Sequence, residues 1–242
     1  MSHYNNQFDM IFGSILQLAS TSDLKWFDLL DPLARHVMDI DIYHTNEDRA
    51  AFNGGLFWHT DHYVDAATST HRTYSAKNAA GRRGYGGGPA SQHNFTTGLL
   101  YFHYLTGDPD ARDAVIGLAD WAERMDDGRW NLLALVDDSP TGWATSTFNF
   151  QGPGRGAGWS INALLDGWLL TGRRHYVECA EALIRRTVHP ADDVAAYDLL
   201  NAELRWSYTL YLTTLARYLH IKADAGEIDV AYQYAQGALV RY

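Results

Sequence analysis

A pair of histidines follows a Gly-Gly turn and lies beside an aspartate and a tyrosine. The stretch GGLFWHTDHY, residues 54–63, contains His59, Asp61, His62 and Tyr63. On a helix, His59 and His62 would share one face because they are three residues apart. Such a set can move protons as acid and base, or donate hydrogen bonds to a ligand lining a cleft. The alternative is that these are ordinary structural side chains.

The same histidine spacing can hold a metal ion, but it lacks the glutamate of the H-E-x-x-H zinc motif. No other full set of ligands with suitable spacing is visible in the sequence. We therefore expect that neither a metal ion nor a cofactor is required.

A glycine-rich stretch, GRRGYGGGPASQHN at residues 81–94, leads into an apolar run. It lacks the G-K-[ST] ending of a P-loop and does not follow a strand, so it is not a nucleotide-binding motif. We expect a helix to begin near Asn94 with Asn94 as its N-cap, which would place Gln92, His93 and Asn94 at the positive end of a helix dipole. That end favours an anionic ligand such as a uronate carboxylate, and Arg82 and Arg83 could add positive charge from the loop. The alternative is a simple glycine-rich connection with a capping asparagine.

A second stretch, FNFQGPGRGAGW at residues 148–159, has the same design. Arg155 precedes a helix that we expect to begin near Trp159, and arginine is suited to bidentate binding of a carboxylate. Trp143 and Trp159 could stack on a sugar ring. Two glycine-rich loops that each carry arginine and each enter a helix predict one shared ligand site.

An acidic stretch, IDIYHTNED at residues 40–48, adds a further candidate. Its neighbourhood holds Asp39, Asp41, His44, Glu47 and Asp48. Such a set could bind a metal or polarise a sugar hydroxyl. The alternative is an acidic, solvated loop.

The elements that would position these side chains are helices, because apolar residues recur at three- and four-residue spacing and convincing strands are absent. Helical hairpins are expected over 94–126, 158–188 and 205–241, and a less clear one over 7–40. Within 24–40, Asp23 is the expected N-cap, and Pro32 suggests a kink or a break. The first helix of each pair is the more apolar, as expected for an inner layer.

Helical hairpins must stack to bury their apolar faces. The connections 41–57, 73–92 and 127–157 are long and rich in Gly, Asn, His and Trp, which favours function over disorder. We therefore expect an all-α toroid or partial toroid of hairpins, rather than an open solenoid, with its loops gathered at one end around a cavity. Residues 1–242 form one such domain, either alone or as part of a longer protein.

Composition and net charge limit the classes of partner and the location that we expect. The net charge is −10, and no long basic run is present, which argues against nucleic acid as a partner. A single cysteine, Cys179, excludes an internal disulfide and fits a buried structural thiol. We expect no signal peptide and no membrane span, and a cytoplasmic location fits these observations.

The hairpins HNFTTGLLYFHYLTGDPDARDAVIGLADWAER and GRGAGWSINALLDGWLLTGRRHYVECAEALI, with LARHVMDIDIYH before them, resemble α/α-toroid domains of carbohydrate-active proteins. The best match is the helical domain of exo-rhamnogalacturonan-lyase-like bacterial proteins, over roughly residues 20–190. Such toroids have about six hairpins and accompanying β-domains, whereas this chain has fewer hairpins and no evident β-domain. The resemblance implies a carbohydrate ligand, and no catalytic residue of the family is carried over.

Together these features predict a protein that acts on an acidic oligosaccharide or polysaccharide, with β-elimination as the expected reaction. Arg155 and Asn94 would neutralise the uronate carboxylate, and His93, His59 or Tyr63 would remove the C5 proton.

Two alternatives remain open. Glycoside hydrolysis needs two carboxylates in opposed roles, for which Asp61 with Glu47 or Asp48 are candidates. A non-catalytic carbohydrate-binding or scaffold module would lack a convergent acid and base.

Overall fold

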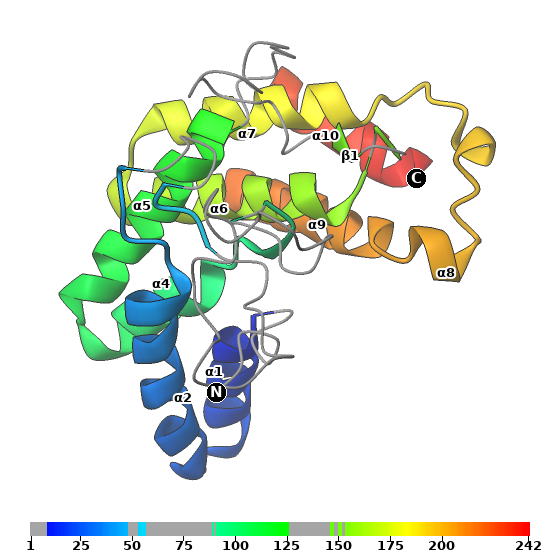
Figure 1. The fold of residues 1–242 in the computed structure, drawn as a ribbon. Helices are drawn as coiled ribbons and strands as arrows, with labels where there is room; N and C mark the ends of the chain where they lie inside the picture. Colours follow the sequence, from blue (N-terminus) through cyan, green and yellow to red (C-terminus); the bar gives the residue numbers. More distant parts are fainter. Residues whose placement is uncertain are drawn as a thin grey trace, which may run out of the picture.

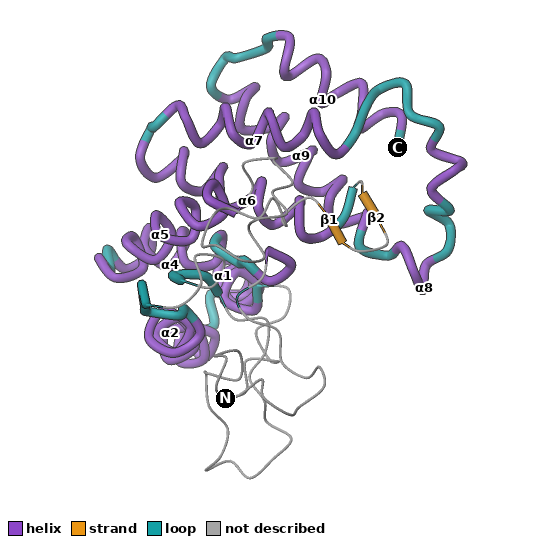
Figure 2. Tube along the Cα trace, turned by 45° about the horizontal axis from the view of Figure 1, so that its top comes forward, coloured by secondary structure: helices purple, strands orange, loops and turns teal. Residues whose placement is uncertain are grey.

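The computed structural model describes residues 9–47, 53–56, 89, 91–125, 146–147, 150–151 and 153–242. Almost all of this part is helical, which confirms the all-α expectation (Figure 2). The long helices are α1 (Met10–Thr21), α2 (Lys25–His36), α4 (Thr97–Thr106), α5 (Pro109–Met125), α6 (Arg155–Thr171), α7 (Arg174–Thr187), α9 (Tyr208–Asp224) and α10 (Val230–Arg241). Short elements are the π-helical turn η2 (Val37–Asp41), the 3-10 turns η4 (Ser91–His93) and η6 (Val194–Tyr197), the helix α8 (Ala202–Arg205), and the antiparallel pair β1 (Ser146–Thr147) and β2 (Phe150–Gln151).

The long helices form consecutive hairpins, namely α1–α2, α4–α5, α6–α7 and α9–α10. The first helices of neighbouring hairpins pack on one another, α1 on α4 and α6 on α9, while α7 and α10 lie along one side of α6 and α9 (Figure 1). The first and last hairpins lie at opposite ends of the stack in both views (Figures 1 and 2). The hairpin expectation is thereby confirmed for the described residues.

Two tight corners have the sequence signals expected of them. Gly107 and Gly172 end α4 and α6 with φ angles of 74° and 69°, a left-handed conformation that costs glycine little. After Gly107, the Asp108 carboxylate accepts hydrogen bonds from the backbone N–H groups of Asp110 and Ala111 and so caps α5. The chain therefore reverses within a few residues at each corner.

Of the kink or break expected at Pro32, the break is absent, because α2 runs through this residue as far as His36. Leu30, Leu33 and Ala34 on either side of the proline are completely buried. Burying two leucines contributes roughly 3–6 kcal/mol, which offsets the ~3 kcal/mol cost of an internal proline. The irregularity comes later, where η2 replaces the α-helical pattern.

Asp23 is not the formal N-cap of α2, which is Leu24. The Asp23 carboxylate nevertheless accepts the backbone N–H of Lys25 at 3.1 Å. The helix thus begins one residue later than expected, and Asp23 still supplies a side-chain acceptor just before its first turn.

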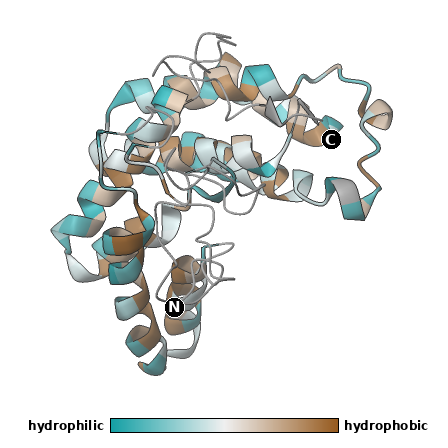
Figure 3. Cartoon of the chain, in the orientation of Figure 1, coloured by the Kyte–Doolittle hydropathy of each residue, from teal (hydrophilic) through white to brown (hydrophobic). Residues whose placement is uncertain are grey.

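The core has two parts, in line with the amphipathic colouring of the helices (Figure 3). One part lies among α1, α2, α4 and α5 and includes Leu33, Leu99 and Leu118. The other lies among α6, α7, α9 and α10, and the half-buried Cys179 packs against it. No helix within the described ranges combines the length and the apolar character needed to cross a bilayer.

Candidate functional site

Arg155, the first residue of α6, contacts two other segments of the chain. Its Nη2 donates a hydrogen bond to Oε1 of Gln92 in η4 at 2.8 Å. Its guanidinium carbon lies 5.4 Å from the ring centroid of Trp206, which precedes α9. Arg155 at the start of α6 therefore contacts both the end of the 73–92 connection and the segment just before α9.

The environment of Arg155 suits an anion. Partial burial lowers the pKa of its guanidinium, yet arginine stays charged at any physiological pH. Within the described ranges no carboxylate pairs with this charge, and the N-cap Gly154 offers no side chain to the first-turn N–H groups of α6. The guanidinium and the positive end of the helix thus act in the same direction.

The residues around Asn94 are placed differently from expectation. The helix begins at Thr97, so Asn94 is not its N-cap, and the expected start is wrong by three residues. Asn94 is completely buried, and its Nδ2 donates to the backbone oxygen of Leu118 at 3.3 Å. Its side chain therefore ties this segment to α5 instead of capping α4.

His93 and Trp159, both predicted ligand or catalytic residues, pack in the interior. His93 is 3% exposed and its ring lies edge-on to Phe95, with centroids 5.6 Å apart. Trp159 is 9% exposed, and its ring also lies edge-on to that of Phe95, with centroids 4.7 Å apart. The aromatic ring that the structure brings to Arg155 is Trp206, which is 41% exposed.

Trp206 was not predicted as a site residue, although a signal existed. Trp206-Ser207 repeats Trp159-Ser160 near the start of the inner helix of another hairpin. The inner helices α6 and α9 pack side by side, with Gly158 of α6 next to Leu210 and Tyr211 of α9, so the segment just before α9 lies beside the start of α6. Internal repetition could thus have identified this ring.

Several predicted site residues lie outside the described part of the chain. They are His59, Asp61, His62, Tyr63 and Trp143, together with Asp48, Arg82 and Arg83. Their roles stay predictions.

The described parts of the long connections do approach one another. The backbone N–H of Tyr43 donates to the oxygen of Gly55 at 2.9 Å, which folds residues 53–56 back on the end of η2. A Cβ on Gly55 would lie 2.5 Å from Cβ of Pro89 and 2.6 Å from Nε1 of Trp121, so only glycine fits there. The chain near Pro89 then leads directly to Gln92 and hence to Arg155.

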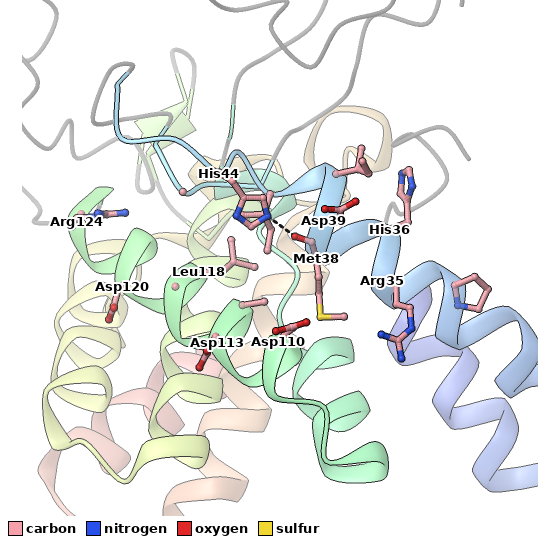
Figure 4. Close-up of a pocket in the computed structure, with 16 residues that line it drawn as sticks. Arg35, His36, Met38, Asp39, His44, Asp110, Asp113, Leu118, Asp120 and Arg124 are labelled. Atoms are coloured by element: carbon pink, nitrogen blue, oxygen red, sulfur yellow. Dashed lines mark hydrogen bonds between the residues drawn. The ribbon is translucent and has the colours of Figure 1, made fainter.

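A separate groove of about 930 Å³ runs between η2 with its following loop and α5 (Figure 4). Its lining has an excess of negative charge, since four aspartates face two arginines: Asp39, Asp110, Asp113 and Asp120 with Arg35 and Arg124. His44, also in the lining, is held by a 2.5 Å contact between its Nε2 and the Met38 backbone oxygen. This charge favours cationic groups, and an acidic sugar fits the Arg155 site better.

The predicted acidic set at 39–48 is divided by the fold. Asp39 and His44 line the groove, whereas Asp41 is 1% exposed and lies 3.5 Å from Nε2 of His36. Glu47 is exposed. These side chains therefore do not form one common site.

A buried polar network, not predicted from the sequence, joins three inner helices. Asp166 of α6 is completely buried and forms an ion pair with Arg217 of α9. The hydroxyls of Thr96 and Thr97 donate to Asp166 Oδ2 at 2.6 and 2.8 Å. Because these partners satisfy the carboxylate, the network positions helices and is not open to a ligand.

No family model, no curated protein and no solved structure matches this chain. The functional proposal is therefore based on the side chains around Arg155.

Proposed function

We propose that this protein binds an acidic, uronate-containing carbohydrate at Arg155 and acts on it by β-elimination. The observation that supports the proposal is a half-buried guanidinium at a helix N-terminus, without a carboxylate partner among the described residues and above an exposed tryptophan. Cationic recognition beside an aromatic ring is the combination that a charged sugar requires.

In this proposal Arg155 pairs with the uronate carboxylate, and Trp206 packs against a sugar face. Neutralising the carboxylate stabilises the negative charge that develops when the C5 proton leaves. Of the three candidate bases, His93 is buried against Phe95, which leaves His59 and Tyr63 as the proposed proton acceptors. Gln92 holds the guanidinium in place through its 2.8 Å contact.

The hairpins are proposed to belong to an (α/α) toroid or partial toroid. Support comes from the order of the described hairpins and from the approach of their connections near Pro89 and Gln92. In such an arrangement the loops at one end surround the ligand.

A non-catalytic carbohydrate-binding module is the second candidate. It is supported by the two contacts of Arg155, with the amide oxygen of Gln92 and with the ring of Trp206, since neither partner is an acid or a base. Both candidates predict the same ligand class and differ only in turnover.

The test is incubation of the protein with a panel of pectic and other uronate polysaccharides. Elimination gives an unsaturated product with ultraviolet absorbance, hydrolysis gives new reducing ends without it, and a binding module gives neither. Binding is measured in parallel by calorimetry with a uronate oligosaccharide and its neutral counterpart. Absence of binding to every uronate would reject the proposal.

A further inference from the structure

Asp120 and Glu123 on α5 and His175 on α7 each bring one ligand atom within 4.8 Å of the other two. The Nε2 of His175 lies 3.5 Å from Oε2 of Glu123. We propose that these three side chains bind a first-row divalent transition-metal ion of the zinc type. The proposal is independent of carbohydrate binding, since the site lies beside the last turns of α6 and Arg155 lies at its first.

The fold brings the three residues together through a close helix contact. Asp120 and Glu123 share one face of α5 because they are three residues apart. A Cβ on Gly167 of α6 would lie 2.8 Å from Cβ of Ala119 and 3.1 Å from the ring of Tyr176. Because Gly167 has no side chain, α5 and the start of α7 can both pack closely against α6 at this position.

One buried tyrosine fixes two of the three ligands. The hydroxyl of Tyr176 donates to Oδ1 of Asp120 at 2.5 Å, and its ring lies 4.1 Å from the ring of His175, centroid to centroid. Tyr176 is itself completely buried, so it is a rigid support. Outer partners that orient ligand side chains are a regular part of metal sites, because they reduce the ordering cost of binding.

The ligand types define the metal class. Imidazole favours zinc and its neighbours over magnesium and calcium, while two carboxylates supply the negative charge that a divalent ion needs. Three protein ligands leave coordination positions for water, the arrangement of catalytic zinc sites. Arg173 also lies near Tyr176, and its single positive charge is smaller than the charge of the two carboxylates.

The surroundings also favour a cation. Asp120 belongs to the lining of the acidic groove and lies at its border in Figure 4. Asp110 and Asp113 line the same groove on the same helix. Arg35 and Arg124 in the same lining offset part of this charge, and the remaining excess of aspartates raises the local concentration of divalent ions near the proposed ligands.

The experiment titrates full-length protein, stripped with a chelator, with zinc chloride in a calorimeter. His175→Gln and Glu123→Gln remove one ligand each. His220→Gln is the matched control, because His220 also faces a carboxylate, Asp224, at 3.4 Å on an exposed surface but has no third ligand among the described residues. Melting temperatures of the metal-free proteins verify that each variant is folded.

We expect one zinc equivalent whose affinity falls at least tenfold in His175→Gln and in Glu123→Gln and is unchanged in His220→Gln. Cobalt in place of zinc should show the visible absorption of a nitrogen- and oxygen-liganded ion, and His175→Gln should abolish it. The proposal is overturned if His175→Gln retains every zinc equivalent at wild-type affinity, or if magnesium competes equally with zinc at this equivalent.

Discussion

Arg155 and Gln92, which are 63 residues apart in the sequence, are joined by a 2.8 Å hydrogen bond between the guanidinium and the side-chain amide oxygen. Gln92 is neutral, so the contact orients the arginine without neutralising it. A charge that is held in place and has no ion pair within the described residues remains available to a carboxylate.

The first prediction concerns this charge. Arg155→Ala should weaken binding of a uronate oligosaccharide by roughly 1.5–3 kcal/mol, the usual contribution of a hydrogen bond to a charged group. The loss should be smaller for the neutral sugar, which has no carboxylate to pair. Calorimetric titration of both ligands measures the difference. The melting temperature should barely change, because Arg155 has no ion pair within the described residues.

Arg174→Ala is the matched control for this variant. Arg174 is also the first residue of its helix and lies 5.7 Å from the ring centroid of Trp168. It forms an ion pair with Glu227, so its charge is already satisfied. Uronate affinity should be unchanged in this variant. Equal losses in both variants, or equal losses of Arg155→Ala for the charged and the neutral sugar, would assign Arg155 a structural role.

The second prediction concerns the ring beneath Arg155. Trp206→Ala should weaken both the acidic and the neutral sugar by roughly 1 kcal/mol, because ring packing does not require charge and the cation–π contact with Arg155 is lost. Trp206→Phe keeps a ring and should recover most of the affinity. If Trp206→Ala binds both ligands like the wild type, the aromatic platform is elsewhere.

The third prediction concerns pH. Burial of Asp9, the N-cap of α1, raises the pKa of its carboxyl from 3.8 to about 6, against the opposing effect of hydrogen bonds from the N–H groups of Phe12 and Gly98. A folded-state pKa above the unfolded value means that the folded protein binds the proton more tightly. Asp9 therefore contributes stability below pH ~4 that is lost as the pH rises through ~6, by about 3 kcal/mol in all.

The measurement is the free energy of denaturant unfolding of wild type and Asp9→Asn between pH 4 and 7. The wild-type minus Asp9→Asn difference should fall over this range. Asp229→Asn is the control, because Asp229 is also an N-cap aspartate, of α10. The lysine partner Lys222 and the N–H of Tyr232 lower the pKa of Asp229 despite the desolvation that opposes them. Its contribution should be nearly constant between pH 4 and 7, because a carboxyl with a lowered pKa loses its stabilising effect only on acidification below pH ~4. A difference independent of pH for Asp9→Asn would contradict the prediction.

The fourth prediction concerns the contact between α1 and α4. A Cβ on Gly98 would lie 2.2 Å from Oδ1 of Asp9 and 2.7 Å from Cβ of Ile11. Gly98→Ala should therefore destabilise the protein by about 1–3 kcal/mol, the typical cost of overpacking. Gly117→Ala is the control, since a Cβ at Gly117 meets nothing within 4 Å. This helical change should be neutral or stabilising by up to ~1 kcal/mol. Urea unfolding measures the change in the free energy of unfolding for both variants. Similar changes in the two would contradict the close contact between α1 and α4.

Local signals in the sequence determined the helical hairpins and their corners. Gly107, Gly172 and Asp108 act over three or four residues, the range in which a helix ends or begins, so their effect follows from the local sequence. Arg155 and Gln92 were predicted as ligand residues for a similar reason, because each was expected to lie between a glycine-rich stretch and a helix. The helix after the second stretch in fact begins at Arg155 itself, four residues before its expected start near Trp159.

Tertiary packing decided which of these side chains meet. Asn94 has the type of an N-cap, but α5 offers it a backbone oxygen at Leu118, and the helix begins later. The pairing of Asp166 with Arg217 spans 51 residues, and no spacing rule connects them. Trp159 and Trp206 follow the same local pattern, yet one is buried beside Phe95 and the other is exposed beside Arg155. Sequence periodicity sets which face of a helix is apolar, whereas the packing of one hairpin on the next decides which of those faces is covered.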